Sequence, residues 1–114
     1  MNFTFQEHID QIRSSVKRLQ KIEGKDWGVE GSLIELMKQV GQLSALVMVQ
    51  EKYYFPNRGE LDKQYAVSKE ALADELADIM FAVVRIADHY NIDLEEANLK
   101  AREIEDKFLK EQGL

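Results

Sequence analysis

The sequence SKEALADELADIMFAVVRIADHY, residues 68–90, carries the strongest structural signal in this chain. Its apolar residues recur every three or four positions, which is the spacing of one face of an α-helix. Ser68 in front of the repeat is a typical N-cap, and Asn91 behind it is a typical stop. The repeat predicts a helix over residues 68–90. Its apolar stripe consists of Leu72, Leu76, Ile79, Met80, Val83, Ile86, Ala87 and Tyr90.

The same period recurs in three other segments. A helix is predicted over residues 5–22, where Thr4 is placed to cap it and Glu7 to complete a capping box. A second is predicted over residues 30–52, with Ser32 as its cap and Glu35 three residues later. A last one follows Asp93, and residues 53–67 read as a loop. We therefore expect an all-α fold, a four-helix bundle formed by one domain over residues 1–114.

Composition limits the class of protein. The chain has 114 residues, no cysteine and a net charge of −6. Disulfides, thiol catalysis and cysteine-ligated metals are excluded, and an acidic surface disfavours nucleic-acid partners. The longest apolar run, Ile79 to Val84, is far shorter than the roughly 20 residues of a membrane span. With no secretory signal in MNFTFQEHID, we expect a cytoplasmic protein without membrane contact.

Two short motifs in the central helices match each other. Gln39-Val40-Gly41-Gln42-Leu43 and Glu75-Leu76-Ala77-Asp78-Ile79 both read polar, apolar, small, polar, apolar. The spacing places each polar pair on one flank of its helix. If the two helices pack antiparallel, both pairs can face one cleft between them.

Glu75 and Asp78 suit one half of a site for Mg²⁺ or Mn²⁺. These cations prefer oxygen ligands, and carboxylates one turn apart supply them. The same spacing also occurs on solvated acidic helix faces, which the helix dipole favours near an N-terminus. Glu35, one turn before Gln39, is either a further ligand or the capping partner of Ser32.

These motifs resemble those of the MazG-like, all-α NTP pyrophosphatase superfamily, which includes phosphoribosyl-ATP pyrophosphatases and dimeric dUTPases. Its members carry an ExxE motif on one helix and an ExxD motif on the next. The corresponding segments here are QVGQL at residues 39–43 and ELADIM at residues 75–80. The run RIADHYNIDLEEA, residues 85–97, also fits the family, so that the likeness covers about residues 25–97.

The resemblance implies a metal-dependent reaction in which water attacks a nucleoside triphosphate and releases a nucleoside monophosphate and pyrophosphate. Glu75 and Asp78 would be ligands of Mg²⁺ or Mn²⁺ and would carry the catalysis. Gln39 and Gln42 stand where the family has glutamates. Glutamine keeps a carbonyl oxygen but loses the charge, so that this half of the site would hold a cation more weakly.

Three further residues are candidates for substrate binding. Lys38 precedes the first motif, where it would repel a cation if its side chain pointed inward and could otherwise contact phosphate. Related enzymes often have a lysine at the position that corresponds to Ala101 here. A shift of the alignment by one residue would place Lys100 at that position. Trp27 either stacks on a nucleobase or anchors the start of the second helix by packing.

Three functions follow as alternatives. The first is a divalent-metal-dependent nucleoside triphosphate pyrophosphohydrolase, with Glu75 and Asp78 supporting it. The second is a catalytically silent module for binding or assembly, which Gln39 and Gln42 support. The third is a purely structural bundle, against which the match between the two motifs argues. Apolar residues near the end of the second helix, among them Met48, predict that the chain also pairs with itself as a dimer or tetramer.

Overall fold

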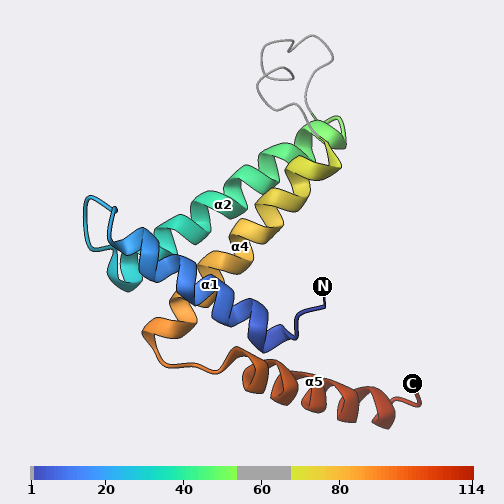
Figure 1. Ribbon diagram of the computed structural model, residues 1–114. Helices are drawn as coiled ribbons and strands as arrows, with labels where there is room; N and C mark the ends of the chain where they lie inside the picture. Colours follow the sequence, from blue (N-terminus) through green and yellow to red (C-terminus); the bar gives the residue numbers. More distant parts are fainter. Residues whose placement is uncertain (1, 54–67) are drawn as a thin grey trace. The chain divides into compact units, whose positions relative to one another are not determined.

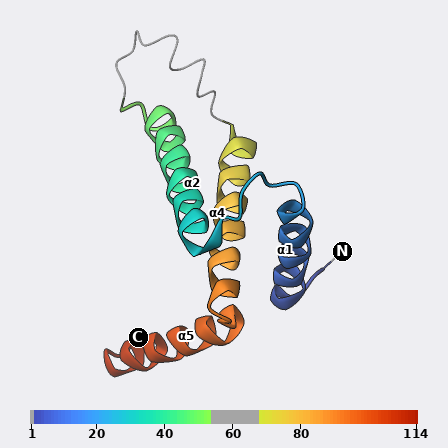
Figure 2. The same cartoon turned by 90° about the vertical axis from the view of Figure 1, so that its left-hand side faces the viewer.

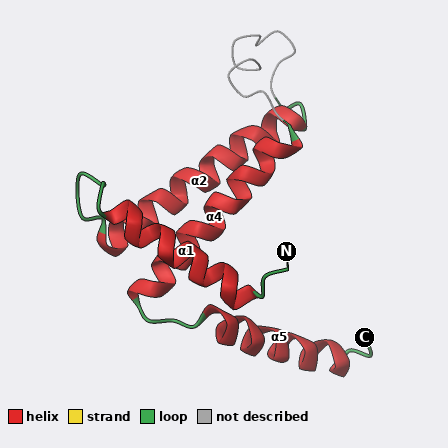
Figure 3. Cartoon of the chain, viewed as in Figure 1, coloured by secondary structure: helices red, strands yellow, loops and turns green. Residues whose placement is uncertain are grey.

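The computed structural model describes residues 2–53 and 68–114, and the regular secondary structure in that part of the chain is helical. Its elements are α1 (Phe5–Gln20), α2 (Gly28–Gln50), α4 (Lys69–His89) and α5 (Leu94–Glu111) (Figure 1). The described residues contain no strand (Figure 3). The all-α class is therefore confirmed for the described residues. The predicted loop falls mainly on residues 54–67, which lie outside them. In the described ranges, no helix combines the length and apolar character needed to cross a membrane.

The predicted helix starts are largely correct because local capping patterns specify them. Thr4 Oγ1 accepts a hydrogen bond from the Glu7 N–H at 3.1 Å, and Glu7 Oε1 accepts one from the Thr4 N–H at 3.2 Å. The Ser68 hydroxyl oxygen accepts the N–H of Ala71 at 3.1 Å in front of α4. At α5, the Asp93 carboxylate accepts the N–H of Glu96 at the same distance. Each bond satisfies an N–H that the first turn of a helix leaves unpaired.

The predicted cap of α2 is wrong. Ser32 lies inside the helix, and its hydroxyl donates to the Gly28 carbonyl oxygen at 2.9 Å instead of accepting an N–H. The helix begins at Gly28, whose φ of 59° lies in the left-handed region that glycine adopts readily. Trp27 occupies the N-cap position without a side-chain cap, and the Gly31 N–H donates to its carbonyl oxygen at 2.9 Å.

The described chain divides into two compact units. One unit is Trp27–Val83, which holds α2 and residues 69–83 of α4. There the two helices lie side by side and antiparallel in both views (Figures 1 and 2). The buried residues of α2 are Ser32, Gln39 and Leu46, each seven residues from the next. They define the inner face of α2, and Ala82, 2% exposed, is the most buried residue of α4 in this unit.

The other unit comprises the residues up to Asp26 together with Val84–Leu114. Its core contains Ile9 and Val16 of α1 with Val84 and Ala87 of α4. Two ion pairs connect the segments of this unit. Arg85 donates two hydrogen bonds to the Glu23 carboxylate at 2.7 and 3.0 Å, and Arg13 donates one to Asp88 at 2.7 Å. Helix α5 belongs to this unit and has no buried residue.

Candidate functional site

In each of the two polar motifs, the first polar residue is buried or half-buried and the second polar residue is exposed to solvent. Gln39 is buried at 9% exposure, and Glu75 is half-buried on α4. Gln42 and Asp78, one turn later on their helices, are exposed. Because a step of three residues turns a helix by about 60° short of a full circle, the second residue moves from the inner face to the flank. The two motifs thus lie on the neighbouring helices α2 and α4, with the same order of burial along each motif.

Glu35 is the residue to which Gln39 and Lys38 are tied. The Gln39 side-chain nitrogen donates to Glu35 Oε1 at 2.7 Å. The Lys38 ammonium lies 3.8 Å from Glu35 Oε2. Both carboxylate oxygens of Glu35 therefore have a partner. Neither partner is Ser32, with which the sequence suggested that Glu35 could form a capping box. Glu35, Lys38, Gln39, Glu75 and Asp78 are called the polar cluster below.

Two oxygens of the polar cluster are buried with no hydrogen-bond partner among the described residues. They are Gln39 Oε1 and Glu75 Oε2, the side-chain oxygens of the first residue in each motif. An amide oxygen is an acceptor only, and so is an ionised carboxylate. Burying such an atom unpaired costs about 1–3 kcal/mol. A donor or a cation beside each oxygen would remove that cost.

The electrostatic surroundings of Glu75 are dominated by negative charge. Burial raises the pKa of Glu75, and the nearby carboxylates of Asp78, Asp74 and Glu35 raise it further, while the Lys38 ammonium lowers it. Desolvation and like charges both disfavour the ionised form. The site therefore holds more negative charge than its one lysine balances, which is a condition that favours cation binding.

The donor atoms of the polar cluster fit a hard divalent cation in their chemistry. Glu75 and Asp78 offer carboxylate oxygens and Gln39 an amide oxygen, an all-oxygen set of the kind that Mg²⁺ and Mn²⁺ accept with water completing the shell. The described part of the chain nevertheless contains no group of three or more acidic or histidine side chains gathered closely enough to hold a metal alone. The protein would thus supply only part of the coordination shell.

The three predicted substrate-binding residues lie in different surroundings. Lys38 is exposed beside Glu35 in the polar cluster. Trp27 is half-buried, and its Cβ would lie 2.7 Å from a methyl group added at Gly31, so it packs closely on the first turn of α2. Lys100 belongs to the other unit and pairs with Glu96 at 2.8 Å, a contact that raises the pKa of the lysine.

Sequence reasoning missed the ion pair between Arg85 and Glu23. The Arg85 side chain is only 8% exposed and that of Glu23 14%. A signal was present, because Arg85 directly follows the apolar pair Val83-Val84 in an otherwise apolar helix segment. A buried arginine with two hydrogen bonds to one carboxylate is geometrically specific. This ion pair connects α4 to the segment that follows α1, within the same compact unit.

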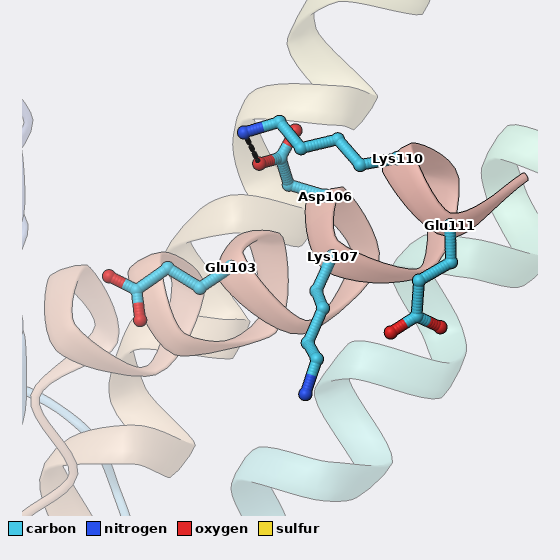
Figure 4. Close-up of a pocket in the computed structure, with 5 residues that line it drawn as sticks. All are labelled: Glu103, Asp106, Lys107, Lys110 and Glu111. Atoms are coloured by element: carbon cyan, nitrogen blue, oxygen red, sulfur yellow. Dashed lines mark ion pairs between the residues drawn. The ribbon is translucent and has the colours of Figure 1, made fainter. Parts of the chain in front are cut away.

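A hollow on α5 offers no competing site. It is lined by five charged side chains, all from that one helix: Glu103, Asp106, Lys107, Lys110 and Glu111 (Figure 4). Lys110 and Asp106 pair with each other at 2.9 Å. Figure 4 shows Lys107 and Glu111 directed away from that pair. Without convergence of polar groups from several elements, the hollow lacks the character of a binding site.

Comparisons with known proteins assign no relative to the chain. No protein-family model, no curated protein and no solved structure matches it.

Proposed function

We propose that the chain is a divalent-metal-dependent nucleoside triphosphate pyrophosphohydrolase, with the polar cluster of α2 and α4 as its site. The observation that carries the proposal is a pair of buried oxygens, Gln39 Oε1 and Glu75 Oε2, which have no hydrogen-bond partner within residues 2–53 and 68–114 and belong to the first residue of each of the two matching motifs. The negative surroundings that raise the pKa of Glu75 support the same assignment.

In this proposal Glu75, Asp78 and the amide oxygen of Gln39 hold Mg²⁺ or Mn²⁺. When bound, the ion supplies charge neutralisation for the triphosphate and acidifies a bound water. Lys38, exposed at the edge of the cluster, is placed to contact a phosphate oxygen. Attack of water on the α-phosphorus would break the α–β anhydride and yield a nucleoside monophosphate and pyrophosphate.

Pyrophosphate release from a panel of standard and modified nucleoside triphosphates, with Mn²⁺ or Mg²⁺, tests the proposal. Turnover by the wild type that Asp78→Ala abolishes would support it. Asp78 is exposed, so this substitution leaves the packing of α4 intact. Absence of turnover in the wild type across the whole panel would contradict it.

A catalytically silent module is the second candidate, and the bonds of Glu35 favour it. Because Lys38 and Gln39 already contact the two oxygens of that carboxylate, Glu35 would have to rearrange or share these contacts to serve as a replacement ligand. The double variant Gln39→Glu/Gln42→Glu separates the two candidates. Silence in the wild type with turnover in the double variant would identify a pyrophosphohydrolase scaffold that has lost its chemistry, and would direct the search to binding partners.

A further inference from the structure

Positive charge gathers at the C-terminal end of α1, although the chain as a whole has a net charge of −6. Four cations lie within residues 17–25, and all four are exposed. None of them forms an ion pair with another of the described residues. They are Lys17, Arg18, Lys21 and Lys25, which are called the basic end of α1 below.

The basic end of α1 faces away from the core of its unit. Ile9 and Val16 mark the buried face of the helix. Because an α-helix turns by about 100° per residue, Lys17, Arg18 and Lys21 are rotated by roughly 100–160° away from that face. Their charged groups are therefore directed to solvent, where they are available to a partner outside the chain.

The acidic residues nearby do not cancel this charge. Glu23 lies in the same stretch, but Arg85 holds its carboxylate with two hydrogen bonds at 2.7 and 3.0 Å. Asp26 is the only other acid within residues 17–26, against four cations. Asp10 lies seven residues before the first of them, about 10 Å along the helix axis. Charges at such distances are largely screened at physiological salt, so the local charge determines what this surface attracts.

An isoleucine is exposed in the middle of the basic end of α1. Ile22 is 80% exposed, and among the large apolar residues that the structure describes only the terminal Leu114 is more exposed. A defined turn holds Ile22, because its N–H and that of Glu23 donate to the Leu19 carbonyl oxygen at 2.9 and 3.0 Å. The surface thus presents one apolar side chain surrounded in sequence by cations.

The helix dipole accounts for part of this arrangement. It favours cations in the last turn of α1, where Lys17 and Arg18 lie. Its influence falls off within that turn, whereas Lys25 follows the helix end at Gln20 by five residues. It also gives no reason for an exposed isoleucine among the cations. A partner that combines negative charge with an apolar layer accounts for both features.

We propose that the basic end of α1, together with Ile22, is a docking surface for an anionic phospholipid membrane. Clusters of four or more exposed cations bind acidic headgroups, and each cation strengthens binding roughly fivefold. The boundary between headgroups and acyl chains receives an apolar side chain such as Ile22. The net charge of the chain predicts no membrane contact, but a contact of this kind depends on the local charge. The inference does not depend on the proposed activity.

Co-sedimentation of the full chain with lipid vesicles tests the proposal. Wild-type protein should bind vesicles of phosphatidylcholine that contain about 30% phosphatidylserine, and should not bind vesicles of phosphatidylcholine alone. Because the attraction is electrostatic, the bound fraction should fall steeply as NaCl rises from about 50 to 500 mM.

Lys21→Glu should weaken binding to the anionic vesicles at least about 20-fold, because it replaces one attraction by a repulsion of similar size. Lys107→Glu is its matched control. It changes the net charge equally at an exposed lysine of α5, which Figure 4 shows directed away from the ion pair of that helix. Lys107→Glu should bind like the wild type. Circular dichroism identifies a variant that has lost its helices, and Lys25→Glu then takes the place of Lys21→Glu.

Ile22→Ser should weaken binding about tenfold, because it removes the side chain that enters the lipid. Ile104→Ser is the matched control, since Ile104 is 74% exposed but lies on α5. Binding that Ile22→Ser leaves unchanged, with equal affinity of both proteins for polyglutamate, would indicate a surface for acidic protein or nucleic acid and overturn the lipid assignment.

Two further outcomes would overturn the proposal. One is a wild type that does not bind the anionic vesicles even at about 50 mM NaCl. The other is an equal loss of binding in Lys21→Glu and Lys107→Glu, which would attribute the contact to the charge of the whole chain.

Discussion

The amide of Gln39 is held by Glu35, one turn earlier on α2, through a hydrogen bond of 2.7 Å. This bond uses the nitrogen end of the amide and thereby directs the carbonyl oxygen elsewhere. That oxygen is buried and has no partner among the described residues. Only a side chain with both a donor and an acceptor can bond to Glu35 and still present an acceptor at the site. Glutamine therefore has a definite structural role at position 39.

Gln39→Glu should lower stability without metal and restore it with metal. A glutamate cannot donate to Glu35, so two carboxylates would meet in a buried position, at a cost on the order of 1–3 kcal/mol. If the site binds a cation, about 5 mM Mn²⁺ should raise the melting temperature of the variant by several degrees more than that of the wild type. Thermal unfolding with and without Mn²⁺ measures both effects.

Gln50→Glu is the matched control, because it makes the same change at an exposed position at the end of α2. Its melting temperature should respond to Mn²⁺ as the wild type does. Equal metal responses in all three proteins would count against a cation site at Gln39.

Glu75→Gln should stabilise the protein at neutral pH and not at low pH. The pKa of Glu75 is raised in the folded state from its ordinary value of 4.5 by burial and by Asp78. The folded state then binds the proton more tightly than the unfolded state. The wild type therefore loses stability as pH rises from about 4.5 through the folded pKa. Glutamine removes this loss, so the stability difference should appear above that window and vanish below it.

Urea unfolding of the wild type and Glu75→Gln between about pH 4 and pH 8 measures this difference. Glu70→Gln provides the same chemical change at an exposed position in the first turn of α4. A stability gain of Glu75→Gln that is constant across the pH range would show that packing, and not ionisation, is responsible.

Arg85→Ala should be strongly destabilising. It leaves the Glu23 carboxylate, whose side chain is 14% exposed, without its two hydrogen bonds. Removing one partner of a buried ion pair typically costs about 3–5 kcal/mol. Arg102→Ala breaks an exposed pair with Glu105 at 3.7 Å and should cost less than about 1 kcal/mol. Urea unfolding that finds equal losses for the two variants would refute the structural role of Arg85.

Gly31→Ala and Gly41→Ala should have opposite effects, which bears on the role of Trp27. A methyl group at position 31 would lie 2.7 Å from Trp27 Cβ, whereas one at position 41 would meet no atom of the described residues within 4 Å. Overpacking at Gly31 should cost about 1–3 kcal/mol. Replacing the glycine at position 41 by a better helix former should gain about 0.5–1 kcal/mol. Thermal unfolding measures both, and a neutral Gly31→Ala would show that Trp27 does not anchor α2 by packing.

The sequence allowed the helices to be predicted because their signals are local. Thr4, Ser68 and Asp93 each cap the helix that follows them, and the apolar period locates the rest. The start of α2 was mispredicted because Ser32 matches the capping pattern while Gly28, with its positive φ, begins the helix earlier. A capping pattern alone does not reveal the contact between Trp27 and Gly31.

The sequence predicts which residues belong to the candidate site, but not the contacts between them. The matching motifs identified Gln39 and Glu75, but not that Glu35 would bond to Gln39 or that one oxygen of each would lack a partner among the described residues. Because α2 is apolar around most of its circumference, its periodicity does not select which stripe faces α4. That choice depends on tertiary packing, which the sequence pattern does not specify.

The rotational setting of α2 has a consequence for engineering the protein. The helix buries Ser32 and Gln39, whereas Leu33 and Val40, which have the same spacing and are apolar, are 50% and 44% exposed. A rotation of α2 by one residue would bring these apolar side chains to the buried face, so they favour a competing rotational setting of this helix. Replacing them with polar residues to improve solubility would also remove the competitor. Such a variant should have a more uniquely defined inner face than the natural sequence.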